Sequence, residues 1–150
     1  MIAYPDTSFL CALYRQQDNS PEAARCFAAM PEALHVSALL LYEFRQSVRF
    51  QVFLHTKDKK KGYGKAEADG ALANLQSNIA AGALVIVPAD WAAVYAIAER
   101  LSAQYTWTTG QRAFDIIHVA TALQLGAREF LSFDSNQRKL AEAEGLKALP

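Results

Sequence analysis

The sequence predicts an α/β protein: a three-layer α/β/α sandwich in which helices cover both faces of a short central parallel sheet. Three observations support this class. Short apolar runs alternate with helical patterns of ten or more residues, as in parallel βαβ units. Leu84 to Val87 has the continuous apolar character of a buried strand. The chain of 150 residues has the size of one domain and can bury about 70% of its unfolded surface, so we expect one core.

Four segments have the character of strands. The first is followed at once by Pro5 and Asp6, where a new element starts, and Pro88 ends the third, because proline cannot donate to a strand ladder. The strands are expected at residues 2–4, 34–36, 84–87 and 130–133.

Helix signals occupy the segments between these strands. Ser20, Pro21 and Glu22 combine an N-cap, a proline at the first helical position and an acid in the first turn. Ser37 caps the longest helix, and Gly126 marks the end of a later one. The helices are expected at about residues 7–17, 20–30, 38–55, 66–81, 89–105, 113–125 and 137–144.

Composition excludes several classes of protein. Hydrophobic residues make up 52% of the chain and no low-complexity tract interrupts it, which excludes a disordered protein. The first residues lack the basic and apolar regions of a signal peptide, and no stretch resembles a membrane helix, so we expect a cytoplasmic protein outside the membrane. Cys11 and Cys26 form no CxxC pair or Cys/His cluster, and we interpret both as small buried hydrophobes.

Four carboxylates stand where the apolar pattern calls for a hydrophobe or a helix cap: Asp6, Glu43, Asp115 and Asp134. Asp6 and Asp134 directly follow the first and last predicted strands, and ligand sites in parallel α/β sheets lie at the carboxyl ends of strands. Glu43 falls on a helical stripe with Leu40 and Phe50. The helices that carry Glu43 and Asp115 could lean over the same edge of the sheet.

Each acid also has an explanation that needs no function. Glu43 could pair with a nearby arginine, since a lone buried carboxylate is costly. Asp115 suits the first turn of a helix, and aspartate is common in the turn after a strand. Considered together, converging acids repel one another unless a cation neutralises them, and Mg²⁺ and Mn²⁺ prefer oxygen ligands. The set therefore predicts a metal site, where the simplest chemistry is metal-activated water attacking a phosphodiester.

Net charge bears on a nucleic-acid partner. The chain has 15 basic and 15 acidic residues, which at first disfavours binding to phosphates. Setting the four proposed site acids aside leaves 15 basic against 11 acidic residues, a charge of +4 outside the site. A modest positive rim could then hold phosphates.

Around these acids stand several motifs: Asp6-Thr7-Ser8; Glu43 early in a long helix; Arg112-Ala-Phe-Asp115-Ile-Ile-His118-Val-Ala120-Thr-Ala122-Leu; and Phe133-Asp134, followed by Leu140-Ala141 and Gly145-Leu146. They resemble a PIN domain, in particular the VapC-type toxin ribonucleases of bacterial toxin–antitoxin pairs. The resemblance spans nearly the whole chain, residues 1–150, as one domain, and it is most specific from Arg112 to Leu123. It implies that the four acids form the catalytic metal site, with Ser8 supplying a hydroxyl beside it.

The resemblance also implies a function and partners. The activity would be metal-dependent (Mg²⁺ or Mn²⁺) endoribonucleolytic cleavage of RNA by a homodimeric toxin that a cognate antitoxin restrains. An alternative is an RNA- or protein-binding module on a PIN fold that lacks turnover. A phosphatase or phosphotransferase is a third possibility, but the haloacid-dehalogenase kind needs a second aspartate where this chain has Ser8.

Several residues keep two interpretations. Arg112 could hold a substrate phosphate or pair with a site acid. His118 is interpreted as packed and hydrogen-bonded rather than catalytic, and Trp107 as packed between helices rather than stacked on a base. The lysine-rich stretch at 56–65 is either a solvated, flexible loop or a phosphate-contacting arm on which Tyr63 stacks with a base.

Overall fold

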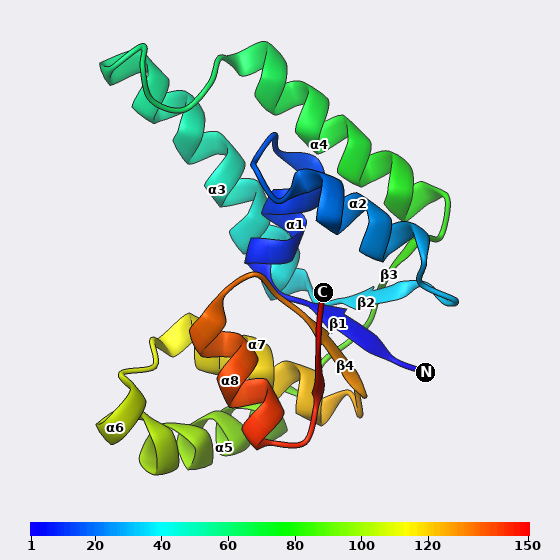
Figure 1. The fold of residues 1–150 in the computed structure, drawn as a ribbon, viewed down its shortest axis with the longest axis vertical. Coiled ribbons are helices and arrows are strands. Elements are labelled where there is room, and N and C mark those ends of the chain that lie inside the picture. Colours follow the sequence, from blue (N-terminus) through cyan, green and yellow to red (C-terminus); the bar gives the residue numbers. More distant parts are fainter.

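The computed structural model describes all 150 residues and confirms the predicted α/β class (Figure 1). Its five short strands are β1 (Ala3–Pro5), β2 (Leu34–Val36), β3 (Leu84–Ile86), β4 (Glu129–Leu131) and β5 (Lys147–Leu149). β1 pairs with β4 and β4 with β5, while β2 pairs with β3, and every pairing is parallel. β2 also lies next to β1, so the strands follow the order β3-β2-β1-β4-β5.

Helices cover the strands on two sides (Figure 1). One layer holds α1 (Thr7–Tyr14), α2 (Ser20–Ala28), α3 (Ala38–Lys57) and α4 (Lys65–Ala80). The other holds α5 (Trp91–Leu101), α7 (Ala113–Gln124) and α8 (Ser135–Ala143), with α5 packed along α7. The joined ends of α3 and α4 extend beyond the rest of the first layer, at the top of Figure 1. No helix combines the length and apolar character that a membrane span requires.

One core of 30 buried apolar residues joins the layers. Tyr4 and Phe130, on the paired strands β1 and β4, are fully buried, and their rings stack with centroids 6.4 Å apart. The Tyr4 hydroxyl bonds to Ser37 Oγ at 2.9 Å and so ties β1 to the end of β2. Burying side chains of this size contributes about 2–3 kcal/mol each, which fixes the register of the strands whose ends carry the site.

Polar residues cap the helices that follow three of the strands. Asp6 Oδ1 accepts from the Phe9 amide at 2.9 Å, and Ser37 Oγ accepts from the Leu40 amide at 3.2 Å. Asp134 Oδ1 caps α8 by accepting from the two amides that follow it at N2 and N3, each at 2.9 Å. Each cap satisfies amides that the first helical turn leaves without partners, so the chain turns sharply at the carboxyl ends of these strands.

The structure corrects several expectations. A fifth strand, β5, follows Gly145, so the strand before Asp134 is not the last one. The helix expected at 89–105 ends at Leu101 and continues as a π-helical segment, η1 (Ser102–Thr106), and a single turn, α6 (Trp107–Thr109). Trp107 is 88% exposed. The expectation that it packs between helices is wrong, because α6 is a single turn that contacts little except η1.

The cysteines also differ from each other. Cys11 is buried, as expected, whereas Cys26 is only half-buried, and both are free thiols. The interpretation as a buried hydrophobe therefore holds for Cys11 alone.

Candidate active site

Asp6 lies at the carboxyl end of β1 with its side chain completely buried. Its Oδ1 accepts from Ser8 Oγ at 2.6 Å and from the Phe9 amide at 2.9 Å, and its Oδ2 accepts from Ser132 Oγ at 2.5 Å. Burial raises the pKa of Asp6 above its ordinary value, although the hydrogen bonds from Ser132 and Ser8 work in the opposite direction. A nearby cation would favour the ionised form of this carboxyl group.

Two serine hydroxyls connect β1 with the segment after β4. Ser8 Oγ, which donates to Asp6, accepts from the Phe133 amide at 2.9 Å. Ser132 Oγ donates to Asp6 and accepts from the Asp134 amide at 3.0 Å. Ser8 therefore lies beside Asp6, as the resemblance implied. Ser132 was missed; its signal in the sequence was a hydroxyl in the apolar run from Phe130 to Phe133.

Asp115 and Asp134 both lie close to the guanidinium group of Arg112. Arg112 Nε donates to Asp115 Oδ2 at 2.9 Å, and Arg112 NH2 lies 3.8 Å from Asp134 Oδ2. Gln137 Nε2 also donates to Asp115 Oδ1, at 3.2 Å. Of the two interpretations of Arg112, the structure shows pairing with a site acid. The arginine side chain is 76% exposed, so its charge is accessible to a ligand from solvent. Sequence reasoning missed Gln137, which is buried one turn after Asp134.

Glu43 reaches the same region from the first turns of α3 and bonds to His118 Nε2 on α7. Thr7 Oγ1 lies 3.4 Å from the same nitrogen. His118 is only 1% exposed, which confirms the packed, hydrogen-bonded interpretation, and the partner of Glu43 is this histidine rather than an arginine. Burial alone would raise the pKa of Glu43, but the hydrogen bond and charge of His118 lower it below its ordinary value.

The stripe on which Glu43 was placed shares only Leu40 with the buried face of α3. That face is formed by Leu40, Leu41, Phe44 and Val48. The Glu43 side chain is 31% exposed at its flank, and Phe50 is 48% exposed. The stripe was expected in the core because Phe50 is large and apolar, but a large apolar residue on a helix is not always buried.

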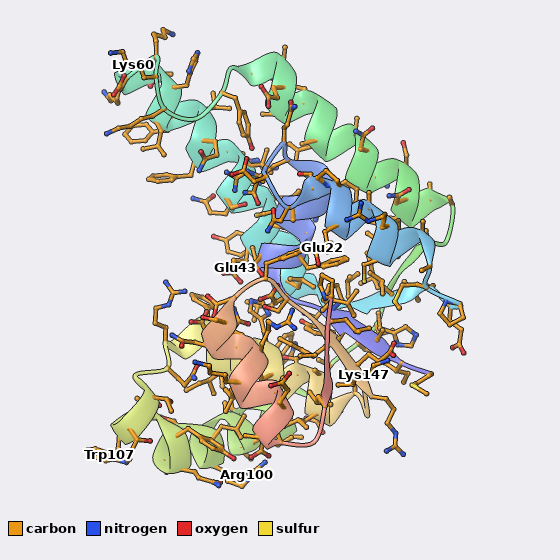
Figure 2. The ribbon with its side chains drawn as sticks, in the orientation of Figure 1. Glu22, Glu43, Lys60, Arg100, Trp107 and Lys147 are labelled. Atoms are coloured by element: carbon orange, nitrogen blue, oxygen red, sulfur yellow. The ribbon has the colours of Figure 1, made fainter.

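Glu43, Arg112 and Asp115 line one cavity of about 210 Å³, together with Ala113 and Phe114. Figure 2 shows Glu43 near the inner end of α3, where the two helical layers approach each other. A larger cavity of about 300 Å³ lies beside α8 but contains none of the four acids. The smaller cavity is the better candidate for chemistry, because its walls combine carboxylates with an accessible arginine.

The structure brings the four predicted acids to one edge of the sheet, but it does not gather them around one point. Asp115 and Asp134 share Arg112, Glu43 holds His118, and Asp6 lies beneath, enclosed by hydroxyls. No group of three or more acidic, histidine or cysteine side chains stands in an arrangement that would hold a metal ion. The oxygen donors fit Mg²⁺ or Mn²⁺ in kind. The assignment of the four acids as metal ligands stays a prediction.

Comparisons with known proteins agree with this architecture. The PIN domain model matches residues 3–143, and the chain belongs to the PIN domain family. VapC20 from Mycobacterium tuberculosis is similar in structure, with a TM-score of 0.59 and 20% identity over 99% of both chains. FitAcB from Neisseria gonorrhoeae gives 0.61 and 18%, over 99% of this chain and 97% of that one.

VapBC2 from Rickettsia felis, solved with a DNA fragment from its promoter, gives a TM-score of 0.63 at 16% identity, over 99% of this chain and 97% of that one. At such identities the likeness concerns the fold. No curated protein matches the sequence.

Proposed function

We propose that this chain is a Mg²⁺- or Mn²⁺-dependent endoribonuclease and the toxin of a toxin–antitoxin pair. The observation that carries the proposal is the cavity at the carboxyl edge of the sheet, which Glu43 and Asp115 line beside the exposed guanidinium of Arg112. Membership of the PIN family supports a nuclease. Among the similar structures, VapC20 is described as a sarcin-ricin loop cleaving toxin, which supports RNA as the substrate class.

In this proposal, Asp6, Glu43, Asp115 and Asp134 hold the metal. A bound divalent ion lowers the pKa of a coordinated water and stabilises charge on a phosphodiester. Ser8 and Ser132 hold the Asp6 carboxylate in place through the hydrogen bonds described above. Preorganised ligands of this kind avoid the cost of reorganising them during the reaction.

Arg112 acts on the substrate. Its side chain is 76% exposed, so it can turn a guanidinium edge toward a phosphate. Arginine binds phosphate through two parallel hydrogen bonds, which would orient the scissile group over the carboxylates.

The partners follow from the same proposal. One of the similar structures, from Klebsiella pneumoniae, is a toxin–antitoxin complex. We infer that a cognate antitoxin protein binds this chain, that the chain forms a homodimer and that it acts in the cytoplasm.

The test is incubation of the purified protein with total cellular RNA in Mg²⁺, in Mn²⁺ or in EDTA, followed by mapping of the new RNA ends. The proposal expects discrete new ends in the presence of a metal ion and none in EDTA. RNA binding without new ends under any condition would favour the alternative, a binding module on the same fold.

A further inference from the structure

The exposed face of α3 carries aromatic and basic side chains that the proposed site does not use. Phe50 and Phe53 are 48% and 50% exposed, and their rings stack with centroids 5.7 Å apart. Lys57 Nζ lies 5.5 Å from the centre of the Phe53 ring. Because residues seven apart share a helix face, Glu43, Phe50 and Lys57 lie in one line along α3.

The loop after α3 adds a concentration of positive charge. Residues 49–65 contain six basic residues and one acidic residue, whereas the remaining 133 residues contain 9 basic and 14 acidic residues. Lys59, Lys60 and Lys61 are exposed and make no ion pair with the protein. Figure 2 shows Lys60 at the outer end of the α3–α4 pair, away from Glu43 at the inner end.

The lysines are held in a defined turn. The Lys61 amide donates to the Asp58 carbonyl at 2.9 Å, and the Lys60 amide donates to Asp58 Oδ1 at 3.0 Å. His55 Nδ1 lies 3.1 Å from the Lys61 carbonyl oxygen and ties the turn back to α3. The segment is therefore a solvent-exposed loop, as the first interpretation expects, and it contains a hydrogen-bonded turn. The alternative in which Tyr63 stacks on a base does not fit the structure, because its ring packs against the core with Arg15 over it.

We propose that the α3 arm, defined as the exposed face of α3 from Glu43 to Lys57 together with the loop at 58–64, binds a single-stranded segment of the RNA substrate next to the cleavage site. This inference rests on the proposed ribonuclease function. Lysines contact the phosphates, and Phe50 and Phe53 stack on the bases of a single strand, whose π faces are not covered by neighbouring base pairs as they are in a duplex. From Glu43 to Lys57, the helix extends about 21 Å, a span of several nucleotides.

The positive charge of the α3 arm favours RNA over a second copy of the chain as its binding partner. A two-fold symmetric contact places the same surface on both partners, so a dimer centred on the loop at 58–64 would bring two clusters of unpaired lysines together. An RNA backbone instead supplies negative charge that complements the lysines at the outer end of the arm.

The test measures RNA binding and cleavage separately. Affinity for a fluorescent single-stranded RNA of about 15 nucleotides, and for the matching duplex, is measured by anisotropy in EDTA at several salt concentrations. The variant Lys59→Ala/Lys60→Ala/Lys61→Ala should bind more weakly, and the slope of log affinity against log salt should fall by about 2, since each phosphate contact to a single strand contributes about 0.7. The variant Phe50→Ala/Phe53→Ala should bind roughly 10-fold more weakly or worse with the slope unchanged.

Matched controls remove the same groups elsewhere. Arg25→Ala/Arg128→Ala/Lys139→Ala deletes three exposed basic side chains outside the α3 arm, and Tyr95→Ala deletes an aromatic side chain that is 59% exposed on α5. Both controls should keep the affinity of the wild type. Equal effects of the control and arm variants would overturn the inference, and so would wild-type affinity that is as high for the duplex as for the single strand.

The experiments give different results if the arm inference is wrong and if the proposed ribonuclease function is wrong. If the wild type cuts cellular RNA and the arm variants bind and cut as well as it does, the arm inference is wrong while the nuclease stands. If the wild type cuts no RNA in either metal, the proposed function fails first. Loss of self-association in Phe50→Ala/Phe53→Ala without loss of RNA affinity would assign this face to a second copy of the chain instead.

Discussion

Replacing Asp6 by asparagine removes one buried negative charge and preserves the shape of the side chain. The amide oxygen can keep the bonds from Ser8 Oγ and the Phe9 amide, and the amide nitrogen can donate to Ser132 Oγ, which then accepts instead of donating. The Ser132 hydroxyl then has Ser8 Oγ, 3.3 Å away, as its remaining acceptor, and the second amide hydrogen of the asparagine is left without a partner. The substitution thus separates loss of charge from loss of packing.

The structure indicates the expected effect of Asp6→Asn on the free energy of unfolding. Three charge-assisted hydrogen bonds become neutral ones, at a cost of about 1 kcal/mol each, but the burial of an ionised carboxylate, worth several kcal/mol, is relieved. The net effect of Asp6→Asn is an increase of about 0–2 kcal/mol in the free energy of unfolding. This corresponds to a melting temperature raised by up to about 6 °C in a protein of this size.

The gain should depend on pH in a defined direction. Because burial raises the pKa of Asp6, the native wild type binds this proton more tightly than the unfolded chain does, and it loses stability as the pH rises above the ordinary carboxyl range. The asparagine variant has no such loss. Its advantage is therefore present at neutral pH and disappears in acid, where Asp6 is protonated.

The assay compares cleavage of a defined RNA in Mn²⁺ with thermal melts of the same preparations. Asp6→Asn should lower the cleavage rate by at least about 100-fold and abolish toxicity in cells, with a melting temperature unchanged or higher. Asp18→Asn, at an exposed aspartate outside the site, is the control and should cut RNA as the wild type does. Full activity of Asp6→Asn would refute the assignment of Asp6 to the metal site.

Further substitutions test other contacts. Arg112→Ala should reduce kcat/KM by about 10- to 100-fold and change the melting temperature by no more than about 2 °C, because the side chain is 76% exposed; a large loss of stability would show a structural role instead. Because His118 lowers the pKa of Glu43, the stability advantage of the wild type over Glu43→Gln should be present at neutral pH and should shrink as the pH falls through that lowered pKa; an advantage independent of pH in thermal melts would contradict this. Gly62→Ala should lower the melting temperature and weaken RNA binding, since its Cβ would lie 2.0 Å from the Gln51 carbonyl oxygen at a φ of +59°; an unchanged melt would show that the turn adjusts.

Much of the sheet edge could be predicted from the sequence because local signals coincide there. Pro5 and Asp6 end the first strand, Ser37 caps the helix after the second, and Asp134 caps the helix after the fourth. A cap and a strand end are properties of a few consecutive residues. They placed Asp6 and Asp134 correctly at the carboxyl edge before any tertiary contact was known.

The errors arose where local pattern and tertiary packing disagree. β5 starts with Lys147 and is a three-residue strand paired only with β4, so it lacks the apolar run of a buried strand. The apolar side chain of Trp107 predicts that it packs between helices, but α6 is too short to reach the core. Phe50 was likewise expected to be buried on α3, but its aromatic side chain points to solvent.

The partners of the acids could not be predicted, because they come from other elements. Glu43 and His118 are 75 residues apart, and Asp6 and Ser132 are 126 residues apart. Each acid has its own polar partner in the folded chain: hydroxyls for Asp6, an imidazole for Glu43 and a guanidinium shared by the other two. Such pairing offsets much of the mutual repulsion of the acids. Removal of a single site charge should therefore change stability according to the partner that is left behind, with a gain at Asp6 and a loss at Glu43, whereas both substitutions should impair cleavage.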